Sequence, residues 1–162
     1  MKHLIYFSFL FFCNALKAQS KKETVEWLNS KFTLSAVYEL QIFKYQSTIT
    51  FKEDGSFAIK TEELSKKDNH LVNTTYEYGN LKDFNPNSVK IYKFGEYFFI
   101  QAKCTNTKGC VKKSGGYPED NRVSEGVGFG AIRTEADNNI ENRMLKAIKH
   151  LIVLVGGKTE AF

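Results

Sequence analysis

The sequence predicts an α+β domain in which about seven short antiparallel strands form a bent sheet between an N-terminal helix and a long C-terminal amphipathic helix. Three observations lead to this fold class. Apolar residues recur at helical spacing near both ends of the chain. Between them, short aromatic and β-branched runs alternate with Gly, Asn and Asp turn residues. The sequence has no linker-like or repetitive segment and only two prolines, which favours a single domain.

The first 18 residues have the layout of a secretory signal peptide. A basic start precedes an apolar run from Leu4 to Phe12, and a polar stretch then ends at Ala18. The run is far shorter than the roughly 20 apolar residues of a membrane-spanning helix, which disfavours an uncleaved anchor. We expect cleavage after Ala18 and a secreted or periplasmic domain of residues 19–162. A lipoprotein signal at Cys13 is the alternative, although Phe12 stands where such signals have a small residue.

The charge of the chain is explained by ordinary solvated surface. The sequence has 23 basic and 18 acidic residues, a formal net charge of +5. Loss of residues 1–18 removes two lysines and no acid, which leaves 21 basic against 18 acidic residues, or +3. The lysine pairs at 21–22, 66–67 and 112–113 are dispersed among acids, whereas a nucleic-acid interface gathers its cations on one element. We therefore expect no nucleic-acid partner.

Two cysteines separated by five residues predict a local disulfide. Cys104 and Cys110 remain as an even pair once Cys13 has left with the signal peptide, and an oxidising compartment favours their pairing. They flank a Thr-Asn-Thr-Lys-Gly turn, which we interpret as the loop of a hairpin closed by the disulfide. Closing so short a loop stabilises the fold by about 2 kcal/mol. A zinc site is disfavoured because only His70 and His150 remain as further imidazole ligands, and the spacing is not that of a redox Cys-x-x-Cys pair.

Turn residues divide the middle of the chain into strand-like runs. The expected strands are 36–43, 47–51, 56–61, 73–79, 88–94, 96–104 and 126–134, with an eighth around Val111. The turn Glu53-Asp54-Gly55 is a strong hairpin signal. Polar stretches at 62–69 and 114–122 are expected to be loops.

Helical spacing marks both ends of the domain. Residues 22–32 place Val25, Leu28 and Phe32 on one face, with Trp27 beside them. The C-terminal helix has an apolar stripe, widened by its neighbours: Ile140, Met144, Ala147, Ile148, Leu151 and Val155, with Leu145, Ile152 and Val153. Asn138 followed by Glu141 resembles a capping arrangement at its start, and Gly156-Gly157 supplies its end. Arg143, Lys146 and Lys149 exclude a membrane span.

The order of these elements, about seven short antiparallel strands followed by a long C-terminal helix, resembles the pleckstrin-homology-like superfold. In that fold two strongly bent sheets form a partly open barrel, and the final helix plugs one end of it. The ending KAIKHLIVLVGGK and the early TVEWLNSKF also resemble small uncharacterised secreted bacterial proteins that we associate with this fold. The chain departs from the family in its extra N-terminal helix. Its first hairpin also lacks the family's Lys and Arg cluster, since only Lys44 and Lys52 are present, so head-group binding is not implied.

Four tyrosines form a candidate ligand face. Tyr76, Tyr78, Tyr92 and Tyr97 lie on consecutive expected strands, and alternation puts Tyr76 and Tyr78 on one side. Neighbouring strands could extend that side into an aromatic platform for a peptide, glycan or lipid. The alternative is that the four tyrosines have no binding role and are half-buried barrel residues with solvated hydroxyls.

The remaining candidates for chemistry have structural explanations. His150 lies near a helix end, where a histidine commonly meets the helix dipole or a carbonyl, and His70 lies in a polar loop. The GVGFG run at 126–130 lacks the sequence context of a phosphate-binding loop. We therefore assign no catalytic, cofactor-binding or metal-binding residue.

Three functions remain. The first is a non-enzymatic binding module of the cell envelope or exterior, with a protein, glycan or lipid partner that contacts loops 62–70 and 112–123. The second is an apolar-ligand carrier that uses the barrel interior, for which a cavity above about 300 Å³ is needed. The third is a hydrolase in which His70 or His150 meets a carboxylate and a Ser or Cys in one cleft.

Overall fold

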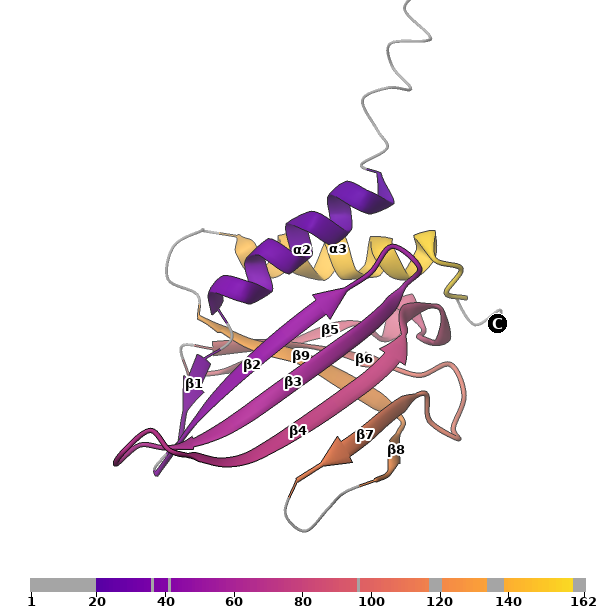
Figure 1. Cartoon of the computed structure of the whole chain (residues 1–162). Coiled ribbons are helices and arrows are strands. Elements are labelled where there is room, and N and C mark those ends of the chain that lie inside the picture. Colours follow the sequence, from indigo (N-terminus) through magenta and orange to yellow (C-terminus); the bar gives the residue numbers. More distant parts are fainter. Residues whose placement is uncertain are drawn as a thin grey trace, which may run out of the picture.

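The computed structural model describes residues 20–158 except 36, 41, 96, 117–120 and 134–138. The expected signal peptide and its cleavage site lie outside the described residues, as does Asn138. Figure 1 shows two helices on the same side of the molecule, the long strands of one sheet running beneath them and a second sheet behind.

All strand pairings are antiparallel. A six-stranded sheet has the order β1-β2-β3-β4-β7-β8, and a three-stranded sheet has the order β5-β6-β9. The strands are β1 Val37–Glu39, β2 Phe43–Phe51, β3 Ser56–Ser65, β4 Leu71–Asn80, β5 Lys90–Phe94, β6 Tyr97–Lys103, β7 Val111–Gly115, β8 Val123–Ser124 and β9 Gly126–Arg133. The helices are α2 Lys21–Ser35 and α3 Ile140–Leu154, and two 3₁₀ turns, η1 Leu81–Asp83 and η2 Pro86–Ser88, join β4 to β5.

The α+β class, with antiparallel strands between two helices, is confirmed, whereas the partly open barrel of about seven strands is not. The strands lie in two sheets, neither of which closes on itself within the described residues. The strand expected at 36–43 is shorter, because β1 ends at Glu39 and Phe43 already begins β2. The strand expected around Val111 is present as β7, and only β8, with two residues, was not expected. A strand of two residues is too short to show a periodic pattern in the sequence.

The first helix is amphipathic as expected. Val25, Leu28 and Phe32 are buried against the core. Ser20 and Glu23 form a capping box, since the Ser20 N–H donates to Glu23 Oε2 at 2.8 Å and the Glu23 N–H donates to Ser20 Oγ at 3.1 Å. Asn29 then attaches the helix to β2 through both backbone groups of Phe51, at 2.8 and 2.9 Å.

The second helix buries most of its expected stripe. Its buried residues are Ile140, Met144, Ala147, Ile148, Leu151 and Ile152. Val153 is 56% exposed, so its assignment to the widened stripe was wrong. It lies beyond the arc of the helix that faces the sheets. The expected end is confirmed: Gly156 has φ +93° and the Gly157 N–H bonds to the Ile152 carbonyl at 2.8 Å.

Phenylalanine fills the space between the layers. Phe51, Phe57 and Phe129 lie with ring centroids 5.3–6.5 Å apart, and Phe32 and Phe84 extend the cluster. Phe98 of β6 is also fully buried. Tilted and edge-on contacts of this kind are the preferred geometry of packed aromatic rings.

The disulfide between Cys104 and Cys110 is present, with Cα atoms 5.8 Å apart. The hairpin expected around it is wrong, because β6 and β7 belong to different sheets. The disulfide instead closes the turn at which the chain passes from one sheet to the other. The backbone N–H groups of the two cysteines donate to the carbonyls of Glu125 and Ser124, at 2.8 and 3.1 Å, which fixes this turn against β8.

The expected loop at 62–69 is also corrected. β3 continues to Ser65 and pairs with both β2 and β4, and only a short turn remains before β4 begins at Leu71. This part of the strand is half-buried along its whole length, with Thr61 bonded to Ser47 at 3.0 Å. Leu64 is the one apolar residue among residues 61–65, so the apolar periodicity that reveals a strand is missing.

Candidate functional site: an aromatic face and its neighbouring groove

The four predicted tyrosines do not form one platform. Tyr76 and Tyr78 lie on β4 of the six-stranded sheet, whereas Tyr92 and Tyr97 lie on β5 and β6 of the three-stranded sheet. The Tyr76 and Tyr78 rings are parallel, with centroids 6.1 Å apart. Lys60 and Ser114 lie opposite Tyr76 on the neighbouring strands, so this pair stands in an otherwise polar row.

The β5–β6 hairpin gathers four aromatic residues on one side. Tyr92 pairs across the ladder with Phe99, and Phe94 pairs with Tyr97. Alternation turns these four residues away from the core. We call Tyr92, Phe94, Tyr97 and Phe99 the aromatic face.

The opposite side of the same hairpin fixes this orientation. Phe98 and Ile100 have no exposed surface and pack in the core. Lys93 shares their side and reaches Glu141 of α3 at 2.7 Å. The aromatic face therefore lies opposite the core and α3.

The aromatic face is only partly covered. Phe94 is 64% exposed and Tyr92 is 50% exposed, while Tyr97 and Phe99 are half-buried. Neighbouring exposed apolar side chains of this kind often mark a site that binds a ligand, another protein or a membrane.

Two members of the aromatic face, Phe94 and Phe99, were missed by the sequence interpretation. The signal was present in KIYKFGEYFFI, where Tyr92 and Phe94 alternate before Gly95 and Tyr97 and Phe99 alternate after it. Gly95 has φ +58° and lies in the turn between the two strands, which makes their pairing local.

A polar groove of about 320 Å³ begins where the aromatic face ends. Gln101 and Gly128 share the side of the aromatic face and line this groove, together with Lys103. The other wall comes from the six-stranded sheet and the segment that follows it, through Lys113, Ser124 and Glu125. A Cβ on Gly128 would have no neighbour within 4 Å, so the groove is open above this residue. We call it the intersheet groove.

The intersheet groove offers both donors and acceptors of hydrogen bonds. Lys113 is held by Glu77 at 2.6 Å, with both side chains less than one third exposed. Gln101 supplies an amide, Ser124 a hydroxyl and Glu125 a carboxylate. Mixed donors and acceptors suit a ligand rich in hydroxyl or amide groups better than a ligand of one charge.

The turn between β3 and β4 forms a second groove, of about 490 Å³. Its walls are partly apolar, from Ile42, Phe43 and Val72, and partly polar, from Ser65, Lys66, Lys67 and His70. The predicted ligand loop at 62–70 therefore does border a groove, although its first half is strand. Lys66 is paired with Glu39 at 2.9 Å.

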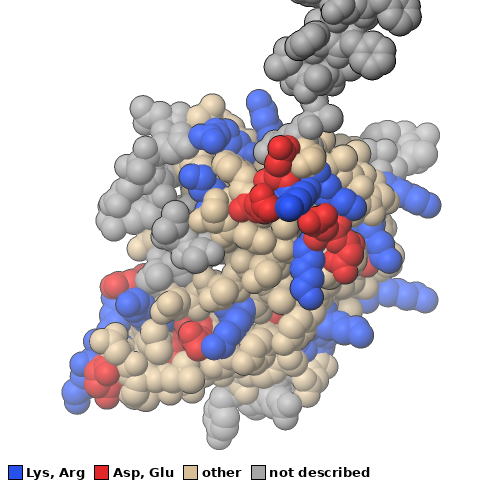
Figure 2. Space-filling model, turned by 45° about the horizontal axis from the view of Figure 1, so that its top comes forward, with Lys and Arg blue, Asp and Glu red and all other residues tan. Residues whose placement is uncertain are grey.

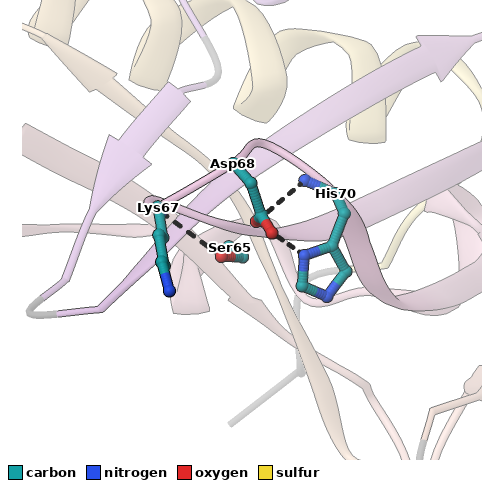
Figure 3. Close-up of polar contacts among 4 residues, drawn as sticks. All are labelled: Ser65, Lys67, Asp68 and His70. Carbon is teal, nitrogen blue, oxygen red and sulfur yellow. Dashed lines mark hydrogen bonds and ion pairs between the residues drawn. The ribbon is translucent and has the colours of Figure 1, made fainter.

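Figure 3 shows the polar residues of this turn. Asp68 Oδ1 lies 2.6 Å from His70 Nδ1, and the Lys67 N–H donates to Ser65 Oγ at 3.3 Å. Hydrogen bonds from the Ser65 hydroxyl and from His70 lower the pKa of Asp68 to about 2. Asp68 thus lies between the hydroxyl and the imidazole.

This order is unsuited to nucleophilic catalysis. A serine nucleophile needs the imidazole as its direct partner, with the carboxylate behind it. Here the Ser65 hydroxyl bonds to the carboxylate instead, and His70 and Asp68 are both more than half exposed. Among the described residues, no three His, Cys, Asp or Glu side chains gather as a metal site.

No family model, curated protein or solved structure matches this chain. In the part of the chain that is described, no helix has both the length and the apolar character needed to cross a membrane.

Proposed function

We propose that this chain is a secreted or periplasmic, non-enzymatic binding module that holds a glycan on the aromatic face and in the intersheet groove. The pleckstrin-homology-like resemblance and the signal-peptide layout are part of this proposal. The observation that carries it is the block of four aromatic rings, two of them at least half exposed, beside a groove of mixed donors and acceptors.

The chemistry of the two parts matches the two sides of a sugar ring. The C–H face of a sugar is apolar and packs on an aromatic ring, while the hydroxyls at its edge both donate and accept hydrogen bonds. Tyr92 and Phe94 offer exposed rings, and Gln101 offers an amide with both kinds of group. Covering a ring that is now half exposed contributes on the order of 1–2 kcal/mol.

The other candidate functions lack a comparable observation. The interior between the sheets and the helices is occupied by packed phenylalanines in the described residues, whereas a carrier needs an enclosed space. The described grooves lie at the surface. A hydrolase needs a base directed at a nucleophile, and the Ser65, Asp68 and His70 contacts have the wrong order for it.

An oligosaccharide array probed with the labelled protein tests the proposal. We expect saturable binding to at least one glycan and a loss of about tenfold or more, about 1.4 kcal/mol, in Tyr92→Ala and in Phe94→Ala. Tyr78→Ala is the matched control, because Tyr78 is an exposed tyrosine, 43% exposed, on the other sheet.

Two results would contradict the proposal. The first is glycan binding that Phe94→Ala leaves unchanged or that Tyr78→Ala reduces equally. The second is an array without binding, combined with capture of a protein by a photo-reactive phenylalanine analogue at position 94. That second result would make the aromatic face a protein interface, for which exposed aromatic residues are equally typical.

A further inference from the structure

The outer ends of β2, β3 and β4 extend beyond the hydrophobic core. β2 and β3 bury side chains only within residues 49–51 and 57–59. In the outer ends, residues 43–48, 60–65 and 71–76, no residue is buried. Figure 1 shows these ends running past both helices to the turn between β3 and β4. They therefore form an arm with two accessible sides.

Four large apolar side chains are exposed at the end of this arm. Leu40, Ile42, Leu71 and Val72 are between 41% and 67% exposed. A backbone hydrogen bond joins the segment before β2 to the turn before β4, because the Lys66 N–H donates to the Ile42 carbonyl at 3.1 Å. Ile42 and Val72 also border the same groove. We call Leu40, Ile42, Leu71 and Val72 the apolar tip.

The arm has apolar residues on both of its sides. Leu64 and Ser65 are consecutive in β3, so alternation turns them to opposite sides of the ladder. Phe43 pairs with Ser65 and borders the groove together with Ile42. Leu71 pairs with Leu64. A flat protein surface can cover one side of such an arm, whereas a lipid bilayer yields around an inserted tip and covers both sides.

A small excess of positive charge surrounds the apolar tip. Residues 39–44 and 64–72 contain three lysines and two acidic residues, a net charge of +1 with histidine neutral. Lys66 pairs with Glu39 at 2.9 Å. The ammonium of Lys67 forms no hydrogen bond or ion pair with another described residue. Figure 2 shows both signs of charge interspersed over the visible face, so the excess at the tip is local.

We propose that the apolar tip inserts into the surface of a lipid bilayer. Its side chains pack at the boundary between head groups and acyl chains, and the neighbouring lysines extend their ammonium groups to the lipid phosphates. Such binding is weak and reversible, because it scales with a small buried apolar area. The apolar tip and the aromatic face belong to different sheets, and this inference does not depend on the proposed glycan.

Vesicle flotation tests the insertion. Residues 19–162 contain every residue that the structure describes and exclude the apolar run at 4–12, which would bind lipid by itself. We expect this chain to bind phosphatidylcholine vesicles, and to bind about fivefold more strongly when phosphatidylglycerol is present. Lys67→Gln should lower this preference for anionic lipid and leave binding to phosphatidylcholine alone nearly unchanged.

Single substitutions localise the binding to the apolar tip. Ile42→Ser and Leu71→Ser should each weaken vesicle binding by about fivefold, because each removes an apolar side chain from the lipid. Val153→Ser is the matched control, since Val153 is 56% exposed on α3, outside the tip. Substitutions of exposed residues change the free energy of unfolding little, so a loss of binding is not a loss of the fold.

A tryptophan placed in the tip reports its depth in the bilayer. Lipid brominated on its acyl chains should quench the fluorescence of the Val72→Trp variant and leave that of the Val153→Trp variant unchanged. Trp27 is the only native tryptophan, and it contributes the same signal to both variants.

Three results would overturn the proposal: no binding to either kind of vesicle, binding that Ile42→Ser and Val153→Ser reduce to the same extent, or equal quenching of the two tryptophan variants. Absence of vesicle binding together with a concentration-dependent dimer that Ile42→Ser dissociates would make the apolar tip a contact between two copies of the chain. None of these measurements contains a glycan, so a failure here is distinguishable from a failure of the proposed function.

Discussion

The two sheets differ in the sides that they turn away from the core. In the six-stranded sheet, that side is polar: Thr48, Lys60 and Ser114 lie in one row with Tyr76. In the three-stranded sheet, the corresponding side of the β5–β6 hairpin is the aromatic face. The first follows the usual alternation of apolar inside and polar outside. The second departs from it, and departures from a local rule that the fold itself does not require mark functional surface.

The core side of the three-stranded sheet should show the largest effect on stability. Phe98 has no exposed surface, and Phe98→Ala is expected to lower the free energy of unfolding by about 3–5 kcal/mol through lost burial and a residual cavity. Denaturant titration measures this. An effect below that of substitutions on the aromatic face would contradict the assignment of the two sides.

The disulfide in the turn between the two sheets should have a smaller effect on the free energy of unfolding. Cys104→Ser combined with Cys110→Ser is expected to lower the free energy of unfolding by about 2 kcal/mol, because a short loop then regains freedom in the unfolded chain. Urea titrations of the wild type and the double variant, each fitted with its own transition slope, measure this difference. An unchanged free energy would mean that the hydrogen bonds to Glu125 and Ser124 hold the turn without the disulfide.

A substitution on the polar side of the six-stranded sheet should have a smaller effect still. Tyr76→Ala removes a ring that is stacked on Tyr78 and half-buried, and we expect a loss of about 1 kcal/mol. The same titration measures it. A loss as large as that of Phe98→Ala would show that this sheet hides a second packed surface.

The smallest effect on stability is expected at Asp68, in the turn between β3 and β4 of the six-stranded sheet. The folded pKa of Asp68, about 2, lies below its ordinary value of 3.8, so the contribution of this group is present above pH 4 and is lost as pH falls toward 2. Ser65→Ala should raise the pKa of Asp68, because the Ser65 hydrogen bond is the largest cause of the shift, and His70→Gln should raise it less. Carboxyl NMR titration would show either result. An unchanged pKa in Ser65→Ala would contradict the hydrogen bond.

Much of the fold could be predicted from local sequence patterns. Val25, Leu28 and Phe32 revealed α2, and most of the apolar stripe of α3 is buried as expected. The extension of β3 to Ser65 could not be predicted, because four of the five residues from 61 to 65 are polar. The place where the chain passes from one sheet to the other could not be predicted either, because the turn between the cysteines looks like a hairpin turn whichever strands it joins.

The candidate site was predictable in part. Tyr92 and Tyr97 were identified by type, but their grouping with Tyr76 and Tyr78 assumed one continuous sheet. Phe94 and Phe99 were missed although their alternation with the tyrosines was readable. The contact between Trp27 and Arg143 could not be predicted, because it joins helices that lie far apart in the sequence.

The central claim is that the aromatic face serves binding and not folding. The most direct test compares Phe94→Ser with the wild type in two measurements on one sample, the free energy of unfolding and the affinity for a glycan selected on the array. Phe94 is 64% exposed, so we expect the free energy of unfolding to change by no more than about 0.5 kcal/mol while the affinity falls at least about tenfold. A fall in stability of several kcal/mol with unchanged affinity would show that the ring belongs to the packing of the fold and would contradict the claim.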